Sequence, residues 1–184
     1  KGALHLYNKF HMEHPSNMFV LEYASRPPLA KIFYEDCLMA AFFYGYPLLI
    51  ENNKYGIARY FESRGYDGYL MSRPSHLRAA NSKVNVKTKG IPSNSQDVIQ
   101  AHAHAIEAYV HDHIGMHRET GEYGKMYFNE TLEDWIGFKI NDRTKFDLTI
   151  SSGLALLAAQ KSKPKKESVN FDEKKFFRRY RPIG

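Results

Sequence analysis

The run YPLLIE, residues 46–51, constrains the fold of this chain more than any other segment. Its first five residues are apolar or aromatic without polar alternation, so both sides of the segment must be covered. Short, continuously apolar strands of this kind are typical of parallel strands in α/β proteins, where helices pack on both faces of the sheet. A helical pattern precedes the run and another follows it. The segment therefore predicts an α/β fold.

The other segments of the first 160 residues supply elements that suit such a sheet. Residues 3–10 and 17–24 are strand-like and joined by a polar turn, which predicts an antiparallel hairpin. Pro27 and Pro28 are expected to start a helix, in which apolar residues recur at helical spacing until Gly45 stops it. Further elements are expected at residues 54–65 (helix), 66–71 (short strand), and 96–114, 132–138 and 147–160 (helices). This order predicts a mixed β-sheet flanked by helices on both faces.

Net charge divides the chain at residue 160. Residues 161–184 hold nine basic and three acidic residues, whereas the preceding 160 hold 17 of each sign. We therefore expect one domain over residues 1–160 and a basic C-terminal tail over 161–184, which is a flexible arm or a partner-binding segment. The single Cys37 lies in an apolar helical pattern, which indicates a core position in a reducing compartment. No apolar run approaches the length of about 18 residues that predicts a membrane span.

A carboxylate ends the apolar run. Glu51 stands where the predicted strand stops, at the sheet edge where functional groups of α/β proteins gather. An unpaired charge at a buried strand end is costly unless a partner or a metal compensates it. Asn52, Asn53 and Gly56 add short side chains and a flexible backbone, as expected where a ligand or a nucleic-acid backbone comes close. The alternative is structural: Glu51 caps the following helix or pairs with Arg59.

A second carboxylate, Asp147, opens the last predicted helix. The small residues Ser151, Ser152 and Gly153 would let this helix lie close to the sheet and bring Asp147 to the strand ends. Two carboxylates at one edge form a hard-oxygen site suited to Mg²⁺ or Mn²⁺. Two such ions about 4 Å apart can clamp the attacking and leaving oxygens of a phosphodiester, so we expect Glu51 and Asp147 within about 8 Å of each other. The alternative is an ordinary N-cap aspartate.

Residues 68–96 contain no acidic residue. They have few core residues, so a long loop or β-ribbon is expected, and its basic residues are Arg73, Arg78, Lys83, Lys87 and Lys89. Such a loop is either a solvated surface or a contact with DNA phosphates.

Several of these segments, in this order and spacing, resemble a known family over residues 17–160. They include the stretch FVLEYASRPPLAKIFYEDCLMAAFFYG, the strand end IENNKYG, the entry KGIPSNSQDVIQ to a helix after the basic loop, and FDLTISSGLALLAA near the end. The set resembles the C-terminal nuclease domain of the large terminase subunit of tailed bacteriophages, which is related to the herpesvirus packaging protein.

The resemblance implies an RNase H-like fold and a metal-dependent endonuclease that cuts concatemeric double-stranded viral DNA. It implies Mg²⁺ or Mn²⁺ in a two-metal site held by three acids. Glu51 matches the acid at the end of the fourth strand, Asp147 matches the acid on the final helix, and Asp142 is an alternative or supporting ligand. Implied partners are viral DNA, the portal protein, the small terminase subunit and an upstream ATPase domain, with no membrane. The implied location is the host cytoplasm, at the procapsid portal during packaging.

The chain also departs from the family pattern. The first metal-binding acid belongs on the first, central strand, but no aspartate precedes Asp36, and residues 3–10 match the second strand. A Walker A pattern is absent as well. Because the chain begins with Lys1, we expect an upstream segment that supplies the missing strand, and weak metal binding and little cutting without it. The other hypotheses are a catalytically silent module that docks on a portal, a motor partner or DNA, and another RNase H-like nuclease such as a transposase or resolvase.

Overall fold

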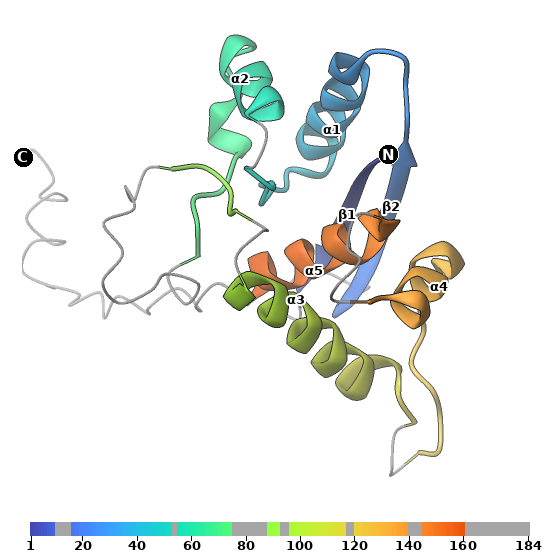
Figure 1. Cartoon of the computed structure of the whole chain (residues 1–184). Helices are drawn as coiled ribbons and strands as arrows, with labels where there is room; N and C mark the ends of the chain where they lie inside the picture. Colours follow the sequence, from blue (N-terminus) through green and yellow to red (C-terminus); the bar gives the residue numbers. More distant parts are fainter. Residues whose placement is uncertain are drawn as a thin grey trace, which may run out of the picture.

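The structure is a computed structural model that describes residues 1–9, 16–52, 55–74, 88–92, 96–116, 120–139 and 145–160. Its elements follow the order β1 (Gly2–Asn8), β2 (Met18–Ser25), α1 (Ala30–Tyr44), α2 (Gly56–Ser63), η1 (Asp67–Tyr69), α3 (Gln96–Tyr109), η3 (Val110–Ile114), α4 (Asn129–Gly137) and α5 (Asp147–Ala159). Figure 1 shows α5 lying along the two strands, with α1 and α2 towards one side and α3 towards the other. The protein is therefore mixed α/β. None of the helices in these ranges combines the length and apolar character that a bilayer crossing requires.

The predicted hairpin is confirmed. β1 and β2 pair antiparallel from Gly2↔Ser25 to Asn8↔Met18, with an irregularity in register between Leu6 and Tyr7. The aromatic residues of the two strands, Tyr7, Phe19 and Tyr23, suit a pleated surface that is covered on one or both sides. The polar turn expected between the strands falls largely at residues 10–15, outside the described residues.

Segment 46–51 pairs less extensively than predicted. Leu48 forms a parallel bridge to Leu70, and Glu51 forms a parallel bridge to Ile91. Within the described ranges, however, the only multi-residue sheet is the two-stranded β1–β2 pair. The mixed sheet expected from the sequence is therefore present only as this hairpin and isolated bridges. The strand expected at 66–71 is mostly the 3-10 turn η1, and only its Leu70 end pairs with the neighbouring backbone.

The helices follow the predictions closely, and their ends have local causes. The first helix begins at Ala30, so Pro27 and Pro28 precede it rather than open it, and Gly45 ends it in the left-handed conformation at φ 69°. The helix predicted over 96–114 is α3 followed by the π-helical turn η3. The helix predicted over 132–138 is α4, which starts earlier, at Asn129. The predicted last helix is α5.

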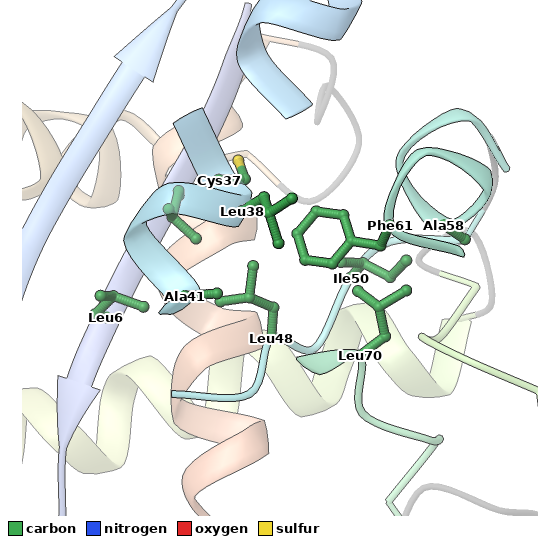
Figure 2. Close-up of a cluster of buried hydrophobic side chains, with 10 residues drawn as sticks. Leu6, Cys37, Leu38, Ala41, Leu48, Ile50, Ala58, Phe61 and Leu70 are labelled. Carbon is green, nitrogen blue, oxygen red and sulfur yellow. The ribbon is translucent and has the colours of Figure 1, made fainter. Parts of the chain in front are cut away.

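Residues 48–50, the centre of segment 46–51, are buried on both faces, as their composition predicted. Leu48 and Ile50 belong to a cluster with α1, α2 and β1, where Phe61 and Leu6 also lie (Figure 2). Leu49 belongs to a second cluster formed by α3, α5, Phe19 and Ile91. Alternate residues of the segment thus face two different helix layers, which is the arrangement that an all-apolar strand requires.

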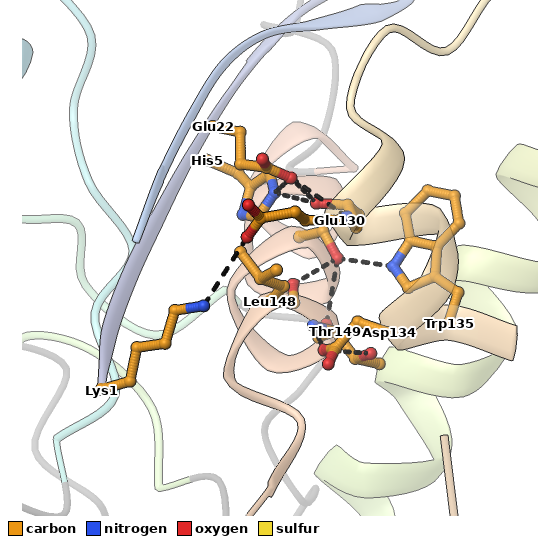
Figure 3. A network of polar contacts seen from close by, with 10 residues as sticks. Lys1, His5, Glu22, Glu130, Asp134, Trp135, Leu148 and Thr149 are labelled. Atoms are coloured by element: carbon orange, nitrogen blue, oxygen red, sulfur yellow. Dashed lines mark hydrogen bonds and ion pairs between the residues drawn. The ribbon is translucent and has the colours of Figure 1, made fainter. Parts of the chain in front are cut away.

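A buried polar network ties α4 to the hairpin and to α5 (Figure 3). The hydroxyl of Thr131 donates to the carboxylate of Glu22, whose Oε2 also accepts the Thr131 backbone N–H at 3.1 Å. Because the one hydroxyl proton of Thr131 is used in this way, its oxygen accepts from His5 Nε2 at 2.8 Å. His5 therefore carries a proton on Nε2. Its Nδ1 is buried with no hydrogen-bond partner.

The stability of the fold should depend on His5 below neutral pH. Burial lowers the pKa of His5 from 6.5 to about 4, because removal from water disfavours the charged imidazolium. A histidine whose pKa is lowered by folding contributes stability above pH 6.5, and this contribution is lost as the pH falls towards 4. The largest loss of stability that this pKa difference allows is about 3 kcal/mol. We expect about 2 kcal/mol, because the carboxylate of Glu22, 3.8 Å from Nε2, offsets part of the loss.

Urea unfolding of the wild type and His5→Gln at several pH values between 7 and 4 tests this expectation. The difference between the two curves isolates His5 from the other titrating groups. If both proteins lose the same free energy of unfolding between pH 6.5 and 4, His5 is not the group responsible.

Candidate functional site

The two carboxylates singled out by the sequence line one cavity. It has a volume of about 1030 Å³ and lies between β1, α1, residues 45–51 and α5. Glu51 enters its lining from the end of segment 46–51, and Asp147 from the first turn of α5. Apolar side chains such as Phe33 and Cys37 from α1, and Leu154 from α5, form much of the remaining wall.

Two backbone edges border this cavity. Every residue from Lys1 to Tyr7 and every residue from Gly45 to Glu51 lines it. In the described ranges β1 pairs only with β2, so its other edge faces away from that partner. Leu48, Ile50 and Asn52 use their backbone groups to bond residues 69–71 and 91. Because successive residues of an extended segment direct these groups to opposite edges, those of Leu49 and Glu51 face the other edge.

The cavity therefore has the form of a slot for one extended strand. Strand edges border it on two sides, α1 supplies apolar residues on one face, and α5 supplies apolar residues on the other. We call this cavity the central slot.

Glu51 is exposed at the end of segment 46–51. The expectation of a costly buried charge was therefore wrong, because the apolar run is buried but the carboxylate that ends it is not. The helix-cap alternative is not supported either, since the N-cap of α2 is Tyr55 and no side chain caps that end. The Glu51 backbone is held in place by the bridge to Ile91.

Asp147 occupies the first turn of α5, but it does not cap the helix. The helix is capped instead by Asp134 of α4. Its Oδ2 accepts hydrogen bonds from the Thr149 backbone N–H at 2.7 Å and from the Thr149 hydroxyl at 2.9 Å (Figure 3). The carboxylate of Asp147 is 38% exposed, and its Oδ2 lies 3.6 Å from the backbone nitrogen of Lys1.

The small residues after Asp147 act differently from the prediction. Ser152 accepts a hydrogen bond from Trp135 Nε1 at 2.8 Å, so it packs towards α4. Gly153 lies against His102 of α3, which a Cβ would approach to 3.1 Å. Only Ser151 lines the central slot. Close helix packing does follow from these small side chains, but mainly against neighbouring helices rather than against the strands.

The residues expected to support Glu51 have structural contacts. Asn52 donates from Nδ2 to the Lys89 carbonyl at 3.2 Å and from its backbone to Ile91 at 3.0 Å. A Cβ at Gly56 would lie 2.5 Å from the Tyr34 hydroxyl, so the close approach that this glycine permits is to α1. Asn53 lies outside the described residues. Sequence reasoning missed Gly90, which at φ 74° passes the Ile50 carbonyl so closely that a Cβ would overlap it.

The basic loop is described only at its two ends. Arg73 is half-buried, and Lys89 directs its ammonium to the Leu70 carbonyl at 2.8 Å. Ser72 and Lys89 form an antiparallel bridge, which brings the two ends of the loop together close to Glu51 and Ile91. Arg78, Lys83 and Lys87 lie outside the described ranges, so their contact with DNA remains a prediction.

The donor set fits Mg²⁺ or Mn²⁺ in kind, because Glu51 and Asp147 offer hard carboxylate oxygens to one cavity. Two carboxylates are few for a two-metal site. Among the described residues, no group of three or more His, Cys, Asp or Glu side chains is placed to hold a metal ion. Asp142, the expected supporting ligand, lies outside the described ranges.

In comparisons with known proteins, no family model, no curated protein and no solved structure matches the chain.

Proposed function

We propose that this chain is the metal-dependent DNA endonuclease domain of a viral packaging terminase, with an RNase H-like fold. The observation that carries the proposal is the shared cavity. Glu51 and Asp147 come from segments almost a hundred residues apart, yet both line the central slot. Neither carboxylate caps its own helix or the following one, so the helix-cap alternative accounts for neither of them.

The central slot supports the RNase H-like part of the proposal. An extended strand in the slot would pair with the open edge of β1 and with the backbone groups of Leu49 and Glu51. Its side chains would need to be apolar on both faces, because α1 and α5 cover the slot from opposite sides. Such a strand, coming from outside residues 1–184, would turn the hairpin and segment 46–51 into one mixed sheet. An acidic residue on this added strand would raise the number of carboxylates at the central slot from two to three.

Chemically, the residues of the site would hold hard cations and a phosphodiester backbone. When bound, the metal ions supply an activated water and neutralise the charge that develops on the phosphate. Glu51 is fixed by the Glu51–Ile91 bridge, and Asp147 by a helix start that Asp134 caps. Rigid placement of this kind is what a two-metal site needs, since small displacements of the ligands are costly in rate.

The experiment that tests the proposal uses the longest natural chain that contains these residues. Incubated with supercoiled plasmid and Mn²⁺, it should produce nicked and linear DNA, and chelation with EDTA should stop the reaction. The second candidate, a catalytically silent module that docks on DNA or on a portal, predicts retarded mobility of the plasmid without any product. The absence of product in Mn²⁺ and in Mg²⁺ would reject the nuclease.

The basic loop should lie on the DNA path. The Ser72–Lys89 bridge places the base of the loop beside the Glu51 end of the slot. Removing one phosphate contact should lower the salt slope of DNA binding by about 1, so the triple replacement Arg78→Ala, Lys83→Ala and Lys87→Ala should lower it by about 3.

Fluorescence anisotropy of a labelled duplex, at several salt concentrations, measures this slope. A matched control removes three exposed lysines elsewhere: Lys31→Ala, Lys125→Ala and Lys139→Ala, all exposed in the structure. Equal slopes for the loop variant and the wild type would remove the loop from the DNA path.

A further inference from the structure

A second cavity, lined by other residues than the central slot, lies between α3–η3 and α4. It has a volume of about 990 Å³, and we call it the α3–α4 groove. Trp135 and Phe138 contribute to its walls together with Met116 and Ile136. Met116 is 58% exposed and Ile136 is 87% exposed, so large apolar side chains border the groove without being covered by the described residues.

The surroundings of this groove are acidic. The three elements α3, η3 and α4 contain six carboxylates and no lysine or arginine. Two of the carboxylates, Glu107 and Asp112, line the groove itself, with side chains 80% and 61% exposed. His111 lies between them on the rim and hydrogen-bonds Asp112 at 2.8 Å. An occupant of this groove should therefore be apolar or aromatic at its centre and basic at its edges.

The chain contains one segment with this chemistry. Residues 174–181 read KKFFRRYR, with five basic side chains and three aromatic ones and no acid. This segment belongs to the tail 161–184, which carries the whole net charge of the chain. Residues 161–184 lie outside the described ranges, so only their sequence enters the inference.

The tail is long enough to reach the groove. Thr149 of α5 lines the groove, and the helix runs from there to its end near Gln160. At 1.5 Å per residue that distance is about 17 Å. Residues 161–173, if extended, span about 40 Å. This length is more than twice the distance from the end of α5 back to Thr149.

We propose that the α3–α4 groove binds the basic aromatic segment 174–181 of the chain's own tail. Phe176, Phe177 and Tyr180 fill the apolar floor, and the flanking lysines and arginines face Glu107 and Asp112. Bound in this way, the tail covers Ile136 and Met116, and its positive charges are neutralised by the domain instead of being free for nucleic acid. The proposal does not depend on the nuclease function.

Zero-length carbodiimide cross-linking of the whole chain tests the proposal, since it joins only a lysine and a carboxylate in direct contact. Mass spectrometry of the monomer should find Lys174 or Lys175 joined to Glu107 or Asp112. A mixture of ¹⁴N- and ¹⁵N-labelled protein distinguishes contacts within one chain from contacts between chains. Cross-linked peptides that combine a light and a heavy chain as often as random pairing of chains predicts would assign the groove to a second copy and overturn the proposal. The complete absence of these cross-links would overturn it as well.

Two variants separate docking in the groove from simple attraction of opposite charges. Ile136→Lys places a cation at an exposed position of the groove, and the cross-link yield should fall by about fivefold or more. The matched control is Phe43→Lys on α1, where the replaced side chain is 81% exposed, and its yield should equal that of the wild type. The double replacement Phe176→Ser and Phe177→Ser keeps every charge and should also lower the yield. An unchanged yield in the double variant would show that charge alone attracts the tail, and would reject the groove as its site.

Discussion

Replacing Glu51 with alanine, in the longest natural chain that contains these residues, should abolish Mn²⁺-dependent plasmid cleavage and leave folding and DNA binding intact. We expect a decrease in cleavage rate of more than a hundredfold, because even the hydrogen-bond partners of metal ligands cost about 10- to 100-fold when mutated. The same change should leave the retardation of DNA in a gel unaltered, since the basic residues are untouched.

The physical reason lies in the position of Glu51 at the exposed end of segment 46–51. Its carboxylate is exposed, no side chain caps the start of α2, and its backbone bridge to Ile91 is independent of the side chain. The apolar residues behind it, Leu48 to Ile50, would still pack. Two carboxylates that face the same cavity repel each other without a cation, so removing one costs little stability or even adds some. Under the proposed function, Glu51 contributes when a divalent cation is bound.

Thermal melts with and without Mn²⁺ separate this role from a structural one. Without metal, Glu51→Ala should melt at the wild-type temperature or slightly above it, and the rise in melting temperature that Mn²⁺ causes should shrink. Glu62→Ala is the matched control, an exposed glutamate of α2 whose removal should change neither cleavage nor the response to Mn²⁺. A destabilised Glu51→Ala with a normal Mn²⁺ response would assign Glu51 to the fold.

Local patterns in the sequence were sufficient to predict the hairpin and the helices. Helical spacing and the left-handed Gly45 placed α1, and alternation with a polar turn placed β1 and β2. The two-sided burial of Leu48, Leu49 and Ile50 also followed directly from an unbroken apolar run. These features depend on residues within a few positions of one another, so the local sequence pattern is sufficient to predict them.

The sheet was harder to predict, because pairing depends on segments distant in sequence. Segment 46–51 has the composition of a central strand, yet its only pairings in the described residues are single bridges to Leu70 and Ile91. On its other side lies the central slot. The residue pattern of one segment cannot show which other segment it will pair with. The sheet predicted from the sequence was therefore more extensive than the observed one.

The candidate site was predicted in part. The sequence indicated Glu51 and Asp147, and both line the central slot. It did not identify Asp134 as the residue that caps α5 and so leaves the carboxylate of Asp147 available for other contacts. An aspartate thirteen residues upstream carries no capping signal, because the contact forms only when α4 and α5 pack. Gly90, a glycine directly before a buried isoleucine, could have indicated the close approach of this backbone to segment 46–51, but the sequence reasoning did not use it.

Gly90→Ala should be among the most damaging single changes, with a decrease of about 2–5 kcal/mol in the free energy of unfolding. Part of this decrease is the left-handed backbone, at φ 74°, which costs a residue with a Cβ about 1–2 kcal/mol. The rest comes from overlap of the new Cβ with the Ile50 carbonyl, since overpacking of a fixed backbone costs about 1–3 kcal/mol. That carbonyl accepts the Ile91 N–H at 2.9 Å, so the strain falls on the contact that aligns Glu51.

Gly45→Ala provides the matched control, because Gly45 has nearly the same φ, 69°, and a Cβ there would meet nothing within 4 Å. Urea unfolding should show only the backbone cost for Gly45→Ala and a further decrease of about 1–3 kcal/mol for Gly90→Ala. Equal decreases in the two variants would mean that the backbone at Gly90 moves freely away from Ile50. In that case residues 90–91 would not hold segment 46–51 in register, and the position of Glu51 at the end of the central slot would need another support. If the two variants differ as expected, the cleavage rate of Gly90→Ala should also fall at temperatures where the variant is still folded. The reason is that the new methyl group displaces the bridge that places Glu51 beside Ile91.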